Sequence, residues 1–169
     1  MVLLDDPLLR AILIGFGGTV ALDVWALLVQ RFTGSPAVNW AMVGRWLGHM
    51  PKGRFVLRQP GAARPVPGES IIGWSAHYVI GAGYGLAVLG VSGPGWFAAP
   101  TPWAPLLVSW ALLIAPYFIM MPGMGTGVAG SKTPCPNRTR LKSLAGHTAF
   151  GVGMYGSALL LTALRPAGG

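Results

Sequence analysis

Four apolar stretches, each long enough to cross a lipid bilayer, divide this sequence of 169 residues. A transmembrane helix needs about 20 consecutive residues that are mostly apolar. The stretches lie at residues 8–32, 71–91, 103–121 and 143–164. Only 9% of all residues are charged, whereas soluble domains carry roughly 25%. The sequence therefore predicts a single all-α integral-membrane domain, residues 1–169, with four transmembrane helices.

A short helix is expected between the first and the second span. Ser35 and Pro36 resemble an N-cap and a first-turn proline, and Pro51 marks the end of the helix that they would start. Its apolar side chains recur on one side, which is typical of an amphipathic helix in the membrane interface: Val38, Met42, Val43, Trp46, Leu47 and Met50.

In the third span, Pro116 predicts a kink that releases the carbonyl of Leu112 from its helical partner.

The basic residues are concentrated in two of the three connections. Residues 33–70 hold five Lys and Arg, residues 122–142 hold four, and the turn at 92–102 holds none. Positively charged connections stay in the cytoplasm, so we expect both termini on the outer side of the membrane. Asp5 and Asp6 occupy the place of a basic signal-peptide region, so the first span is expected to remain in the mature protein.

The net charge of +8 is explained by these connections. We therefore expect the lipid bilayer as the partner of the chain and no nucleic acid.

Two histidines open similar patterns of small residues. His77 is followed by Gly81 and Gly85, and His147 is followed by Gly151. Residues four apart share one helix face, and small residues at that spacing let helices approach closely inside a membrane. The repeat predicts two helices that pack as equivalents, each with an imidazole at a similar depth.

A third ionisable group lies in the first span, where Gly15, Thr19 and Asp23 are again four apart. With the topology above, Asp23, His77 and His147 all lie roughly 6 to 12 Å from the cytoplasmic face, at 1.5 Å per residue. An aspartate within a span is costly and usually faces the protein interior. These three residues form the predicted polar centre.

Three interpretations of the polar centre remain open. It is an interhelical hydrogen-bonded cluster that only fixes packing, a proton or ion relay in a transport path, or a cofactor site. For the last, two histidines and one carboxylate match a ligand set for iron or zinc, and two histidines alone can hold a haem.

Arg45, His49 and Glu69 are candidates for an extension of the polar centre at the cytoplasmic surface, although we favour a solvated interfacial face for them.

Residues 125–133 are glycine-rich, but their spacing departs from that of a P-loop, which excludes nucleotide binding. A basic turn of this kind can still hold a phosphate or a lipid headgroup. Cys135 is the sole cysteine, so no intrachain disulfide is possible.

Several motifs in order resemble a family of small four-span bacterial inner-membrane proteins of unknown function. The resemblance covers nearly the whole chain and is carried by Asp23, the segment from Gly44 to Met50, Gly68-Glu69 with Ile72-Gly73-Trp74 and His77-Tyr78, the glycine loop at 122–134, and His147 with Phe150-Gly151. It implies the four-helix membrane fold and a bacterial inner membrane, and it implies no activity.

The function hypothesis from the sequence is proton- or ion-linked transport of a small solute, centred on Asp23, His77 and His147. The alternatives are a metal- or haem-binding redox protein and a structural subunit of a larger membrane complex. We expect the protein to form a homo-oligomer or to belong to such a complex. The sequence identifies no catalytic residue.

Overall fold

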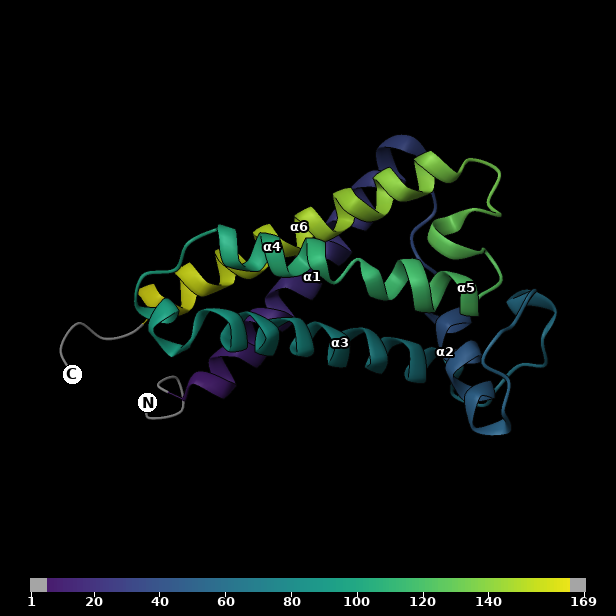
Figure 1. The fold of residues 1–169 in the computed structure, drawn as a ribbon, viewed down its shortest axis with the longest axis horizontal. Helices are drawn as coiled ribbons and strands as arrows, with labels where there is room; N and C mark the ends of the chain where they lie inside the picture. The colour runs from purple at the N-terminus through teal and green to yellow at the C-terminus, as the bar shows by residue number, and fades with distance from the viewer. Residues whose placement is uncertain (1–5, 165–169) are drawn as a thin grey trace. The chain divides into compact units, whose positions relative to one another are not determined.

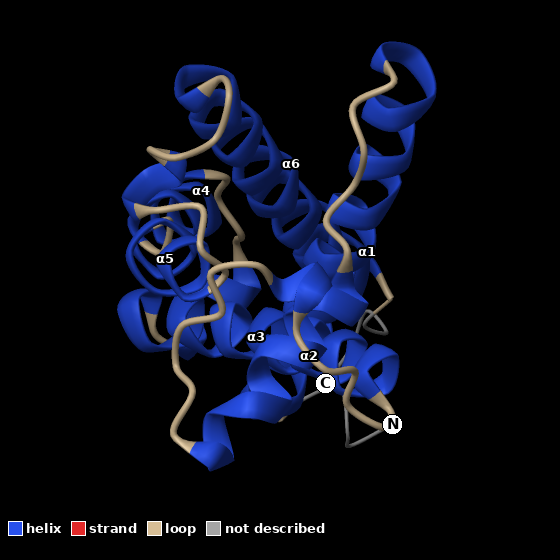
Figure 2. Ribbon diagram, turned by 90° about the vertical axis from the view of Figure 1, so that its right-hand side faces the viewer, coloured by secondary structure: helices blue, strands red, loops and turns tan. Residues whose placement is uncertain are grey.

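The computed structural model describes residues 6–164, which form helices joined by loops (Figure 1). These residues contain no strand (Figure 2). Asp5 and both chain ends, to which the expectations about the termini refer, lie outside the described residues. The α-helices are α1 (Pro7–Thr33), α2 (Trp40–His49), α3 (Glu69–Ser92), α4 (Trp103–Ala111), α5 (Met121–Gly123) and α6 (Pro136–Ala163).

Four helical segments are long and apolar enough to cross a membrane, which confirms the predicted fold class. Three of them are α1, α3 and α6, and the fourth is Trp103–Gly123, which contains α4 and α5. Their ends agree with the predicted spans to within two residues, except at the start of α6. The short helix α2 is the fifth predicted helix, and its location at a membrane surface stays a prediction.

The third span is interrupted ahead of Pro116, where its sequence predicts a kink. Pro116 has no backbone N–H, so the carbonyl of Leu112 lacks the donor that would continue an α-helix. This carbonyl accepts instead from the N–H of Ala115 at 3.0 Å. The following turn, Pro116–Met120, is π-helical. The predicted release of the Leu112 carbonyl from α-helical pairing is confirmed, and a tighter turn supplies its donor.

The start of α2 differs from the prediction. Gly34 ends α1 in a left-handed conformation with φ of 67°, and an extended segment follows. The Asn39 side chain then accepts a hydrogen bond from the N–H of Met42 at 3.2 Å and caps α2. The prediction that Ser35 and Pro36 begin the helix is therefore wrong, because asparagine caps as well as serine and lies beside the first helical residue.

The start of α6 also differs, because Pro136 lies seven residues before the predicted boundary at 143. Proline suits a first helical turn, where its fixed φ is already helical and its missing N–H has no partner to lose. Arg138, Arg140 and Lys142 were predicted in a loop and lie instead on the first turns of α6. Apolar content misplaced the boundary, since Lys and Arg favour helix about as well as leucine does.

The chain forms two compact units. Of the described residues, the first unit contains 6–36, 78–111 and 146–164, and the second unit contains 37–77 and 112–145. The units are described separately below.

In the first unit, α1 and α3 approach each other where both carry small residues. A Cβ added at Gly81 would overlap Thr19, and one added at Gly85 would overlap the carbonyl of Ala11. From the other side, a Cβ at Gly15 would overlap the backbone of Gly81. The predicted stripe on α3 is therefore a close helix contact, and its partner is α1.

The second glycine stripe contacts other neighbours. A Cβ at Gly151 of α6 would lie 3.0 to 3.1 Å from Leu106 and Ser109 of α4. A Cβ at Gly153 would overlap Ala21 of α1. Both α3 and α6 thus contact α1 through glycines, and Gly151 packs in addition against α4. The equivalent packing of the two helices stays a prediction.

In the second unit, α2 crosses the beginning of α3 at a pair of glycines. A Cβ at Gly44 would overlap the Glu69 carbonyl, and one at Gly73 would overlap the Trp40 carbonyl. Beside this crossing lies a buried apolar cluster of Val43, Trp46 and Leu57. The glycines place α2 against the start of α3, and the apolar cluster packs α2 against the connection that contains Leu57.

Replacing Gly85 by alanine should lower the thermal unfolding midpoint of the purified protein. The added methyl group overlaps the backbone of Ala11, and overpacking of this kind costs about 1–3 kcal/mol. Gly83→Ala and Gly90→Ala on the same helix are matched controls, because nothing lies within 4 Å of a Cβ at either position. The controls should keep or raise the midpoint, since alanine is favoured over glycine in helices by up to about 1 kcal/mol. Equal losses at all three positions would contradict the assigned contact.

Candidate functional site

Asp23 lies half-buried on α1, within reach of a tyrosine of α3. The Tyr78 hydroxyl donates a hydrogen bond to Oδ2 of Asp23 at 3.3 Å. Phe16 of α1 packs edge-on against the Tyr78 ring, with 5.9 Å between ring centroids. A phenol, absent from the sequence prediction, is thus a direct partner of the predicted carboxylate.

His147 is half-buried on α6 and meets a second tyrosine of α3. The hydroxyl of Tyr84 lies 3.3 Å from Nε2 of His147, and the tautomer of the ring decides which of the two atoms donates. Tyr84 is only 8% exposed, and Phe150 packs edge-on against it at 5.0 Å between centroids. His147 therefore contacts α3 through a buried phenol.

His77 belongs to the second unit and is buried among indoles. Its ring stacks on Trp40 of α2, with 3.9 Å between centroids and 21° between planes. Trp74, one turn earlier on α3, meets the His77 ring edge-on at 5.7 Å. The imidazole is therefore held by flat aromatic surfaces.

Among residues 6–164, no group of three or more His, Cys, Asp or Glu side chains could hold a metal ion. The geometry therefore gives no support to the alternative metal site on Asp23, His77 and His147. The structure joins Asp23 and His147 to tyrosines and His77 to tryptophans.

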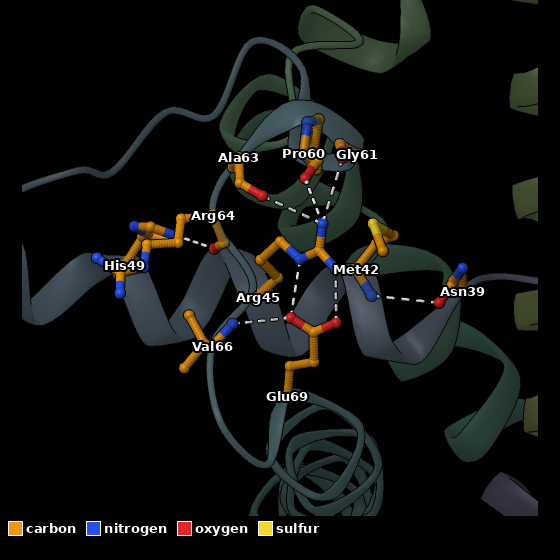
Figure 3. A network of polar contacts seen from close by, with 10 residues as sticks. All are labelled: Asn39, Met42, Arg45, His49, Pro60, Gly61, Ala63, Arg64, Val66 and Glu69. Carbon is orange, nitrogen blue, oxygen red and sulfur yellow. Dashed lines mark hydrogen bonds and ion pairs between the residues drawn. The ribbon is translucent and has the colours of Figure 1, made fainter.

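The most extensive polar network of the second unit surrounds Arg45 (Figure 3). Arg45 of α2 forms a two-pronged ion pair with Glu69 at the start of α3. Its Nε donates to Oε2 at 2.8 Å, and its Nη2 donates to Oε1 at 2.6 Å. Arg45 is 8% exposed and Glu69 is half-buried, so this ion pair is partly shielded from solvent.

The same guanidinium holds the connection between α2 and α3. Its Nη1 donates to the carbonyls of Pro60, Gly61 and Ala63 at 3.2 to 3.4 Å (Figure 3). Glu69 accepts in addition from the N–H of Val66 at 3.0 Å. The ion pair thus ties the connection to both helices that it joins.

His49, one turn beyond Arg45 on α2, is 4% exposed. Its Nε2 lies 2.9 Å from the carbonyl of Arg64, while its Nδ1 is buried and has no hydrogen-bond partner. The favoured interpretation of Arg45 and His49 as a solvated face is therefore wrong. The connection folds back over α2, and an amphipathic pattern cannot reveal such tertiary cover.

The charge of Arg45 is stabilised by its partner. The hydrogen bond to Glu69 raises the pKa of Arg45 above its ordinary value, although burial acts in the opposite direction. Arg45 therefore stays cationic at any physiological pH, and the network is permanently charged on the arginine side.

The second unit is strongly basic. Its segments, residues 37–77 and 112–145, contain nine of the twelve Lys and Arg of the chain but only one acid, Glu69. Glu69 is held by Arg45, so these segments contain no further acid of their own to balance the remaining cations.

Sequence reasoning overlooked Tyr78, Tyr84 and Trp40 as site residues. A signal for the tyrosines was present, since Tyr78 follows His77 and Tyr84 lies seven residues, or two turns, beyond it. No comparable signal existed for Trp40, because the helix that carries it is reached through a separate connection.

Replacing Arg45 by lysine should loosen the connection even though the positive charge is kept. Lysine has no planar fork and cannot bind Glu69 and three carbonyls together. We expect a lower thermal midpoint and faster trypsin cleavage after Arg58, which precedes the tied segment. Arg54→Lys is the control, because the structure gives its side chain no hydrogen bond among residues 6–164. Equal behaviour of both variants would show that the network does not hold the connection.

The family comparison covers most of the chain. A family model described as "Protein of unknown function (DUF2938)" matches residues 12–161. No curated protein and no solved structure matches the sequence. The match agrees with the resemblance to small four-span membrane proteins and with the four candidate spans. The chain belongs to the DUF2938 family.

Proposed function

We propose that this membrane protein moves a small solute together with protons or another ion, with Asp23, His77 and His147 as the ionisable residues that serve this transport. All three residues lie within candidate membrane spans. Ionisable residues are costly at such positions, and they commonly mark proton and ion pathways.

Two of these residues each meet a phenol of α3, and this arrangement is the main support for the proposal. Tyr78 contacts Asp23, and Tyr84 contacts His147, each at 3.3 Å. A phenolic hydroxyl both donates and accepts hydrogen bonds, so it can pass a proton to or from a titratable neighbour. Histidine is also the side chain whose ordinary pKa, about 6.5, suits proton exchange near neutrality.

The indole of Trp40 offers a cation–π contact to His77. A cation over the face of an indole is attracted by the ring quadrupole, and His77 stacks directly on Trp40. Burial removes the hydration that stabilises a protonated His77, and the contact with the indole face would replace part of that stabilisation. His77 is accordingly proposed to take up a proton or to pair with an anionic solute.

We further propose that the protein resides in the bacterial inner membrane with both basic connections in the cytoplasm. The support is the distribution of charge, because the second unit holds nine Lys and Arg and positive connections are retained inside. Both chain ends would then be on the outer side.

The orientation can be tested with the native thiol. Cys135 is exposed and lies in the second basic connection, so in spheroplasts it should resist a membrane-impermeant maleimide until the membrane is permeabilised. Ala99→Cys, made together with Cys135→Ser, places a thiol in the uncharged turn and should react without permeabilisation. The reverse labelling pattern would rule out the proposed orientation.

The transport proposal can be tested in proteoliposomes that contain a pH-sensitive dye. Across a panel of small solutes, the wild-type protein should accelerate the change of lumenal pH for at least one solute, relative to empty vesicles. Asp23→Asn and His147→Gln should abolish this flux, because neither amide can titrate. Tyr84→Phe, which removes only the hydroxyl, should slow the flux.

Tyr155→Phe is the matched control on α6, because its hydroxyl makes no hydrogen bond with any described residue. It should transport as the wild type does. Thermal midpoints measured on the same preparations separate loss of function from loss of fold. A folded Asp23→Asn protein with full flux would favour a purely structural polar cluster, as would a wild-type flux no faster than that of empty vesicles.

A further inference from the structure

We propose that an open surface cavity beside the start of α6 binds a phosphate group, carried either by a lipid headgroup or by a soluble solute. The cavity has a volume of about 430 Å³ and lies within the second unit. Ligand pockets commonly begin at about 300 Å³, so the space admits a phosphate and part of the group that bears it. Its lining consists of Ser131, Cys135, Pro136, Asn137, Arg138 and Arg140.

One lining guanidinium is held in place by neighbouring groups. Arg140 donates from Nε to the carbonyl of Ala129 at 3.1 Å and from Nη1 to Oδ1 of Asn137 at 3.0 Å. Its Nη2 makes no hydrogen bond with the described residues. A fixed guanidinium with an unused nitrogen loses little conformational freedom when it binds an oxyanion.

The other guanidinium is fully available. The Arg138 side chain is exposed and makes no hydrogen bond or ion pair with any residue of the range 6–164. Arginine presents a planar set of donors that matches two oxygens of a phosphate. The hydroxyl of Ser131 adds a further donor to the same cavity.

The charge balance of the second unit favours an anion over a neutral ligand. Two arginines share the cavity wall without a carboxylate, and the unit's one acid is bound to Arg45. A phosphate monoester carries about 1.5 to 2 negative charges at pH 7, so it would offset both arginines at once. A single carboxylate would offset only one.

The thiol of Cys135 provides a direct reporter, because it is exposed and lines the cavity. The experiment measures the rate of maleimide alkylation of Cys135 in nanodiscs at constant ionic strength. One arm titrates inorganic phosphate into phosphatidylcholine nanodiscs, and the other compares these nanodiscs with ones that contain phosphatidate. We expect several-fold slower alkylation in at least one arm.

Protection by inorganic phosphate would indicate a soluble ligand, and protection by phosphatidate alone would indicate a lipid headgroup. In either case, Arg138→Gln should weaken the protection about tenfold, which corresponds to one charge-assisted hydrogen bond. Arg54→Gln is the matched control, because it removes the same charge from the same unit outside the cavity. It should retain wild-type protection.

A second measurement does not use the thiol. In Cys135→Ser, which keeps both arginines, the protecting ligand should still raise the thermal midpoint. The proposal is wrong if neither phosphate source slows alkylation. It is also wrong if Arg54→Gln weakens protection as much as Arg138→Gln, because diffuse charge attraction would then explain the effect.

Discussion

The close approach of α1 and α3 is the contact on which the polar pairs of the first unit depend. The two helices run antiparallel, since Gly85 lies against Ala11 and, one turn along each helix, Gly81 lies against the next small residue of α1. Farther along in the same direction, Tyr78 meets Asp23. Lipid supplies no hydrophobic drive for helices to associate, so close packing and interhelical hydrogen bonds must hold them together. The glycines therefore position the phenol as well as the helices.

The second unit applies the same principle to a charged pair. Gly44 brings α2 against α3, and the next residue, Arg45, reaches Glu69 from that crossing. Removing two charges from water is costly unless further hydrogen bonds satisfy them. Arg45 meets this requirement with three backbone carbonyls, and Glu69 meets it with one backbone N–H. The irregular connection thereby becomes a defined part of the unit.

The sequence predicts the features that depend on apolar length, proline chemistry and small-residue spacing. The four spans, the interruption before Pro116 and the small-residue contact at Gly81 follow from apolar length, a missing N–H and helical spacing. Features that depend on tertiary cover were not predictable in this way. His49 is buried because a distant connection folds over it, and the stack of His77 on Trp40 requires the crossing of α2 and α3. The spacing pattern identified Asp23, His77 and His147 as the ionisable residues of the spans. It did not predict the tyrosines that contact two of them.

The length of α6 has a consequence for the basic surface. Its 28 residues extend about 42 Å at 1.5 Å per residue, whereas a hydrocarbon core is about 30 Å thick. The excess of about 12 Å corresponds to the first eight residues, which include Arg138 and Arg140. A continuous helix would thus carry these arginines beyond the hydrocarbon to a distance similar to the Debye length, about 8 Å at physiological ionic strength. Since arginine stays protonated at any physiological pH, the positive potential of these two arginines would follow the salt concentration and not the pH.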